Sequence, residues 1–136
     1  MAVTPEALRN VPFLAALDKR AVASLVSSMK ERDVAAGKDV VTQGTGGIAF
    51  FVVLEGEAVV VVDGDERRRI GPGDHFGEIA LVLDDAPRTA TVTAVTDLRV
   101  ASLTAWSFRP FVREHPDVAW SLLETLARRV ADTPGA

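Results

Sequence analysis

The first part of the chain carries apolar residues at the spacing of one helix face. Between Thr4 and Ser28, leucines and alanines recur at steps of three and four residues. Thr4 followed by Pro5 suits a helix start, where a hydroxyl can cap and the proline nitrogen needs no partner. Pro12 interrupts the stretch, because proline inside a helix removes a backbone hydrogen bond. The pattern predicts two short helices over residues 4–28.

From Glu31 to Thr104 the pattern changes to short valine-rich runs separated by glycine, aspartate and proline. Asp63-Gly64 lies between two such runs and suits a hairpin turn, whose central residues need positive φ. Short strands at this spacing predict a β-sandwich or barrel. The predicted strands are Val40–Val41, Phe50–Leu54, Ala58–Val62, Arg67–Ile70, Thr91–Ala94 and Leu98–Leu103.

Three further segments have a pattern compatible with a helix, one among the strands and two after the last strand. The first, Phe76–Leu83, interrupts the strand pattern. Trp106–Arg113 and Val118–Val130 come after the last strand and are divided by His115-Pro116. Trp120 shares helical spacing with nearby leucines, so we expect its side chain to pack against the protein. The whole pattern predicts a mainly β domain with helices at both ends.

The composition narrows the classes of protein. A chain of 136 residues with 48% hydrophobic and 25% charged residues fits a single globular domain. It has no cysteine, which excludes disulfides, zinc-thiolate sites and a cysteine nucleophile. The net charge of −4 argues against a nucleic-acid surface over the whole domain. We interpret Arg67-Arg68-Arg69 as a solvated hairpin edge, where charge discourages pairing with another strand.

Catalysis and metal binding find no support in the residue pattern. His75 and His115 are the only histidines, and no further ligands for a metal accompany them. Asp84-Asp85 lies in a turn context, where solvated carboxylates are more common than general acids. Neither a secretory leader nor a membrane span is evident, so we expect a cytoplasmic protein. We therefore expect a protein that is not an enzyme and holds no metal and no cofactor.

The segment from Phe76 to Ala90 carries groups that suit a ligand with a sugar hydroxyl and an anion. Gly77 lets the backbone approach a ligand, and the helix predicted after it would offer N–H groups to an anion. Arg88 supplies a planar set of donors for phosphate oxygens, and Glu78 supplies an acceptor for a hydroxyl. Taken singly, Glu78 could equally be a helix-start residue and Arg88 a surface charge paired with a nearby aspartate.

Taken together, these residues closely resemble the phosphate-binding cassette of the cyclic nucleotide-binding domain family, which includes catabolite activator protein and the regulatory subunits of cAMP-dependent kinase. The matching sequence is Phe-Gly-Glu-Ile-Ala-Leu at 76–81 and Pro-Arg-Thr-Ala at 87–90. Residues 71–75, Gly-Pro-Gly-Asp-His, also resemble the family's entry to the cassette. The likeness covers nearly the whole chain and implies a β-roll of the double-stranded β-helix, jelly-roll-like type with N- and C-terminal helices.

The resemblance implies a role for each cassette residue. Glu78 would accept a hydrogen bond from the ribose 2′-OH, and Arg88 would pair with the cyclic phosphate. Thr89 would lie near phosphate and base, and valine and isoleucine side chains of the roll would form an apolar wall for the purine. The ligand-binding residues that it implies are Phe76, Gly77, Glu78, Ile79, Ala80, Pro87, Arg88, Thr89 and Ala90.

The identity of the ligand stays open between cAMP, which we favour, and cGMP. The Thr89 hydroxyl could meet a guanine amino group without excluding adenine. Arg129 and Thr133 are candidates for a lid over the base, although Arg129 could equally be a cation that compensates the helix dipole. The rival hypothesis is a ligand-free protein-interaction module on the same fold.

We expect the chain to be one domain over residues 1–136. The resemblance implies three parts within it. The helical N-terminus would cover 4–28, the β-roll with its cassette 31–104, and the C-terminal helices 105–131. Such a domain would be a regulatory sensor that signals through movement of its C-terminal helices. No DNA-binding helix-turn-helix follows in this sequence, so the effector would be a partner protein or a fused domain outside it. A homodimer is a further option.

Overall fold

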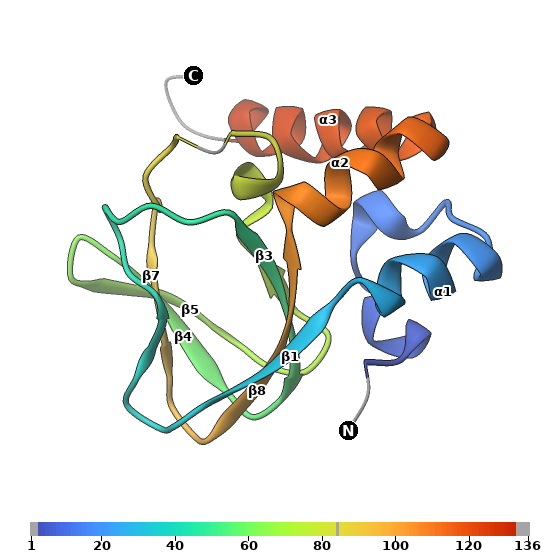
Figure 1. The fold of residues 1–136 in the computed structure, drawn as a ribbon. Helices are drawn as coiled ribbons and strands as arrows, with labels where there is room; N and C mark the ends of the chain where they lie inside the picture. The colour runs from blue at the N-terminus through green and yellow to red at the C-terminus, as the bar shows by residue number, and fades with distance from the viewer. Residues whose placement is uncertain (1–2, 84, 133–136) are drawn as a thin grey trace.

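The computed structural model describes residues 3–83 and 85–132 and contains two four-stranded antiparallel sheets (Figure 1). One sheet has the order β1-β8-β3-β6, and the other has the order β2-β7-β4-β5. The mainly β architecture with flanking helices is the one predicted. The strands are β1 Lys30–Val34, β2 Asp39–Val41, β3 Ala49–Glu55, β4 Ala58–Val62, β5 Asp65–Ile70, β6 His75–Phe76, β7 Thr91–Ala94 and β8 Leu98–Thr104.

The helical segments cover one side of the two sheets (Figure 1). Two 3-10 turns and helix α1 precede the strands, a third 3-10 turn interrupts them, and helices α2 and α3 follow them. The segments are η1 Pro5–Leu8, η2 Pro12–Leu14, α1 Lys19–Ser27, η3 Glu78–Leu81, α2 Ala105–Glu114 and α3 Pro116–Ala131.

Strand β3 is buried on both faces, because the helices cover the face that the second sheet leaves free. Phe50 and Val52 belong to the core under the helices, and the Phe13 ring lies 5.3 Å from that of Phe50. Phe51 and Val53 point the other way, into the core between the sheets. This position explains why the strand is a continuous apolar run instead of an alternating one.

Two strands lie outside the predicted set. Four of the five residues of β1 are exposed, so its charged sequence lacks the alternation of a half-buried strand, and its pairing with β8 makes it a strand. Strand β6 has only two residues and is defined by its pairing with β3. The Asp63-Gly64 turn is confirmed, with φ of 52° and 83° at its two residues.

The predicted helices need three corrections. Residues 4–28 hold two 3-10 turns and one α-helix instead of two short helices, and the helix begins where the Asp18 carboxylate accepts a hydrogen bond from the Ala21 N–H at 2.8 Å. The run at Phe76–Leu83 shrinks to η3, because its first residue belongs to β6. The Trp120 side chain is 66% exposed, so the expected packing is wrong. No helix of the described residues is both long and apolar enough to cross a membrane.

Candidate functional site

The cassette begins where β6 ends against β3. Phe76 lies opposite Phe51 in the strand ladder, and their rings stack with centroids 5.2 Å apart. Gly77 follows with φ of 90°, a left-handed conformation that glycine adopts without strain. A Cβ on Gly77 would lie 3.0 Å from both the Ala49 carbonyl oxygen and Arg88 Nη1. The glycine therefore lets the backbone turn into η3 beside the Arg88 side chain.

Glu78 opens η3 and is only 1% exposed. Both carboxylate oxygens have partners: His75 Nδ1 contacts Oε1, and Arg129 Nη2 donates a hydrogen bond of 2.9 Å to Oε2. Burial alone would raise the pKa of Glu78, but the hydrogen bond from His75 and the charge of Arg129 lower the pKa to about 2. Glu78 is therefore an ionised acceptor held from two sides inside the protein.

Arg88 lies half-buried on the other side of Gly77. Its Nη2 donates a hydrogen bond of 2.8 Å to the Ala49 carbonyl oxygen, and its guanidinium carbon lies 5.9 Å from the centre of the Phe51 ring. Its Nε is buried without a hydrogen-bond partner among the described residues, and no carboxylate among them pairs with this cation. Burial lowers the pKa of Arg88. An anion in this place would supply the partner that the buried guanidinium lacks.

A cavity of about 720 Å³ brings most of the predicted residues together. Phe76, Gly77, Glu78, Arg88, Thr89 and Ala90 line it, and Arg129 reaches it from α3. Ile79 and Ala80 line a smaller adjoining hollow of about 50 Å³. Pro87 lines neither hollow, and Thr133 lies outside the described residues. The apolar wall consists of Val41, Val60, Val62 and Val92.

The structure adds residues that sequence reasoning missed. His75 contacts Glu78, a role that the sequence pattern did not indicate. Gly47 leaves the space for the Arg88 guanidinium, since a Cβ there would lie 2.6 Å from Nη2. Arg67 and Arg68 are exposed on β5, an edge strand of its sheet, as the sequence pattern predicted, and they also line the cavity. The run of three arginines was the only sequence feature that could have drawn attention to them.

Four arginines and one glutamate line the cavity, so its charged side chains carry an excess of positive charge. The start of η3 contributes less to anion binding than the sequence implied, because η3 has only four residues and therefore a small dipole. Recognition of an anion therefore depends on side chains, with Arg88 nearest to the cassette backbone. An ionised acceptor in the same cavity as Arg88, whose guanidinium has no carboxylate partner among the described residues, suits a ligand that carries both a hydroxyl and an anion.

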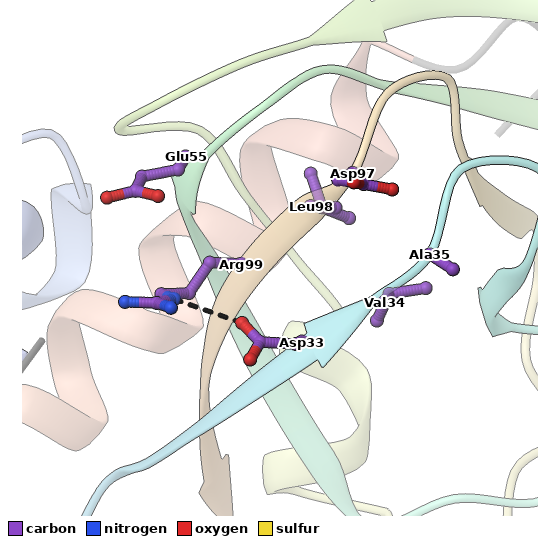
Figure 2. A pocket seen from close by; sticks show the side chains of 7 residues that line it. All are labelled: Asp33, Val34, Ala35, Glu55, Asp97, Leu98 and Arg99. Atoms are coloured by element: carbon purple, nitrogen blue, oxygen red, sulfur yellow. Dashed lines mark hydrogen bonds and ion pairs between the residues drawn. The ribbon is translucent and has the colours of Figure 1, made fainter.

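A second hollow of about 540 Å³ lies at the far end of β3 and is lined by Asp33, Glu55, Asp97 and Arg99. Figure 2 shows Arg99 directed toward Asp33, whereas Asp97 points away from it. Arg99 Nε donates a hydrogen bond of 3.0 Å to Asp33, and the Asp97 carboxylate accepts one of 3.0 Å from the Ala36 N–H. Among the described residues no group of three His, Asp or Glu side chains is placed to hold a metal ion. Arg99 is already paired with Asp33, and Asp97 with the backbone of Ala36, so these groups do not indicate a ligand for this hollow.

Comparison with known proteins identifies the family to which the chain belongs. The model of the family described as "Cyclic nucleotide-binding domain" matches residues 31–115, which is more than half of the chain. The chain belongs to the cyclic nucleotide-binding domain family. The matched range contains the whole cassette and every strand except the first residue of β1.

Two relatives of this cyclic nucleotide-binding domain are regulators by name. A "CRP-like cAMP-activated global transcriptional regulator" of Mycobacterium tuberculosis is 28% identical over 94% of this chain and 59% of its own length. A "cAMP-dependent protein kinase regulatory subunit" of Yarrowia lipolytica is 42% identical over 71% of this chain and 26% of its own length. The catabolite activator protein of Thermus thermophilus is 31% identical with a TM-score of 0.79, over 89% of this chain and 59% of that one. The chain thus spans less than two thirds of these relatives.

Proposed function

We propose that this domain is a regulatory sensor that binds a cyclic nucleotide, with cAMP as the favoured ligand and cGMP as the alternative. The observation that carries the proposal is the Arg88 guanidinium, which lies beside ionised Glu78 in one cavity without a carboxylate partner among the described residues. The names of the relatives in Mycobacterium and Yarrowia support cAMP. Since both names denote regulators, the proposal includes no catalytic step.

The two charged groups of the cassette would divide the recognition of the ligand between them. Arg88 would donate to the oxygens of the cyclic phosphate, and Glu78 would accept a hydrogen bond from the ribose 2′-OH. A carboxylate near a phosphate is unfavourable, but Arg88 and Arg129 would offset this repulsion. Thr89 is exposed on the cavity wall, where its hydroxyl is free to meet the base or the phosphate.

The signal would pass to helix α3 through Glu78. In the structure Arg129 of α3 occupies Oε2 of this carboxylate, so the helix and the ribose hydroxyl would share one acceptor. A ligand that binds one arrangement of α3 better than another shifts the population between them. This proposal favours the lid interpretation of Arg129 over the dipole-compensating one. An effector outside this sequence and the formation of a homodimer are still predictions.

Calorimetric titration of the Arg88→Ala variant tests the proposal. Loss of one charge-assisted contact should weaken binding of cAMP by about 1.5–3 kcal/mol, which is roughly tenfold to hundredfold. Arg20→Ala is the matched control, because Arg20 is an exposed cation of α1 outside the cavity. Equal affinities in the two variants would contradict the role of Arg88.

The rival function is a ligand-free protein-interaction module, and one observation favours it. An apolar hollow of about 370 Å³ lies between η3, α2 and α3, and Val82 and Leu123 on its rim are 49% and 57% exposed. The same titration separates the two functions. If the unmodified chain binds neither cAMP nor cGMP, the interaction module becomes the better explanation.

A further inference from the structure

Strand β6 has two residues, and their side chains lie on opposite faces of the sheet. Phe76 stacks on Phe51, belongs to the core between the sheets and lines the cavity. His75 points the other way, because successive side chains of a strand alternate between its faces. Its ring lies 5.7 Å from that of Phe50, which belongs to the core under the helices. His75 is not among the described residues that line the cavity or the adjoining hollow.

The turn before β6 and the pairing with β3 fix the position of the His75 side chain. In the turn, the Asp74 carboxylate accepts a hydrogen bond of 2.8 Å from the Gly71 N–H. The Asp74 carbonyl oxygen accepts another of 2.8 Å from the Val53 N–H of β3, and His75 lies opposite Val52 in the strand ladder. The His75 side chain is only 18% exposed. Because this side chain is already ordered by the fold, it can direct a hydrogen bond at little further cost in entropy.

The two oxygens of the Glu78 carboxylate have different surroundings. Oε1 contacts Nδ1 of His75, which lies behind the cavity wall, and Oε2 accepts a hydrogen bond from Arg129, which lines the cavity. Because the carboxylate is ionised and can only accept, the proton of this contact belongs to Nδ1. His75 thus occupies one oxygen from behind and leaves the other to groups inside the cavity.

We propose that His75 is a positioning residue for recognition of the sugar. Its hydrogen bond fixes Oε1 of Glu78 and directs Oε2 toward the ligand, so the site discriminates a ribose 2′-OH from a 2′-deoxyribose. This proposal rests on the proposed function, in which Glu78 accepts a hydrogen bond from that hydroxyl. Without His75 the carboxylate would be free to rotate about its terminal bond and to pair through both oxygens with the Arg129 guanidinium. The hydroxyl would then lose its acceptor.

Calorimetric titrations with cAMP and with its 2′-deoxy analogue test this role, and the corresponding guanosine pair serves if the chain binds cGMP more tightly. In the wild type we expect the deoxy analogue to bind on the order of tenfold or more weakly, because a charged acceptor is left without its partner. His75→Phe keeps a ring beside Phe50 but has no donor. It should weaken binding of cAMP and leave the deoxy analogue nearly unchanged, so that the two affinities differ by less than about threefold.

Two amide variants separate the position of the donor from its presence, and they decide the question if His75→Phe does not fold. The amide nitrogen of asparagine is bonded to Cγ, as Nδ1 of histidine is, whereas that of glutamine lies one atom further along the side chain. His75→Asn should therefore keep most of the discrimination against the deoxy analogue, and His75→Gln should lose it. His115→Phe is the matched control, because this second histidine lies between α2 and α3 and is not among the described residues that line the cavity. It should discriminate as the wild type does.

The ratio of the two affinities distinguishes positioning of Glu78 from general support of the cassette. If His75→Phe weakens cAMP and the deoxy analogue equally, or weakens neither, the positioning role is overturned and the proposed function stands. Equal discrimination by His75→Asn and His75→Gln, or a wild type that binds both nucleotides equally well, would also overturn it. If the unmodified chain binds neither cAMP nor cGMP, both proposals fail together.

Discussion

At the scale of single residues, the position of Arg88 depends on the absence of a side chain at Gly47. A Cβ there would lie 2.6 Å from Nη2 and 2.7 Å from Nε of Arg88, so Gly47→Ala would displace the guanidinium. We predict that this variant folds but binds a cyclic nucleotide on the order of tenfold more weakly, because the phosphate contact is misplaced. Calorimetric titration checks this against Gly46→Ala, where the new methyl would meet nothing within 4 Å. Equal affinity in both variants would contradict it.

Glu78 should make the stability of the domain depend on acid pH. Its pKa is about 2 in the folded protein, against a reference value of 4.5, because the contacts with His75 and Arg129 outweigh the effect of burial. A group whose folded pKa is depressed stabilises the fold above the unfolded value and loses that effect as the pH falls through the folded value. The stabilisation should therefore be complete above about pH 4.5 and vanish toward pH 2.

Urea unfolding across this pH window measures the effect. The wild-type free energy of unfolding should fall more steeply than that of Glu78→Gln, which has no carboxylate to protonate at this position. A parallel decline in the two proteins would show that other carboxylates carry the acid dependence.

The residues of the site were predictable to different degrees. Glu78 and Arg88 stand within one short stretch of chain, so their types and spacing in the sequence already indicated both. His75 lies only three residues before Glu78, but nothing in the residue pattern indicated that its ring nitrogen contacts the carboxylate. Arg67 and Arg68 face the cavity because of a bulge, which arises from strand register and leaves no mark in the hydrophobic pattern.

At the scale of elements, burial explains most of the strand predictions, and the exposed strand β5, which follows the Asp63-Gly64 turn, is the exception. Strands β3, β4 and β8 have buried apolar residues, and their runs stand out from the turns around them. Strand β1 is mostly charged and exposed, and β6 has two residues, so neither produces a pattern of its own. Both lie at the edges of one sheet and are strands because a central neighbour pairs with them.

Helix α3 is the element that should respond to the ligand, because Arg129 and a ribose hydroxyl would compete for the same Glu78 oxygen. We predict that a cyclic nucleotide changes amide hydrogen exchange in residues 118–130, and that Arg129→Gln reduces the change. Exchange measured by mass spectrometry with and without the ligand checks this. Arg128→Gln is the control, since Arg128 has no contact with Glu78 in the part of the chain that the structure describes and lies outside the cavity lining. If the ligand changes hydrogen exchange in Arg129→Gln as much as in the wild type, α3 does not respond to the ligand through Arg129 and Glu78.

At the scale of the whole molecule, the charge distribution matters more than the net charge. The chain carries a net charge of −4, yet four of its arginines line one cavity beside a single carboxylate. The net charge argued against a nucleic-acid surface over the domain, but it concealed a local concentration of cationic side chains. Local concentration of cations requires the fold, because the four arginines come from β5, the end of the cassette and α3.

A bound cyclic nucleotide should therefore stabilise the entire domain. At 100 times its dissociation constant a ligand that binds only the folded state adds about 2.7 kcal/mol, which corresponds to roughly 10 °C in the melting temperature of a domain of this size. Thermal unfolding with cAMP and with cGMP measures this rise, and Arg88→Ala at the same ligand concentration should show a smaller one. The comparison matters because an interaction module would unfold at the same temperature with and without either nucleotide. A rise that Arg88→Ala retains in full would mean that the nucleotide binds elsewhere on the protein.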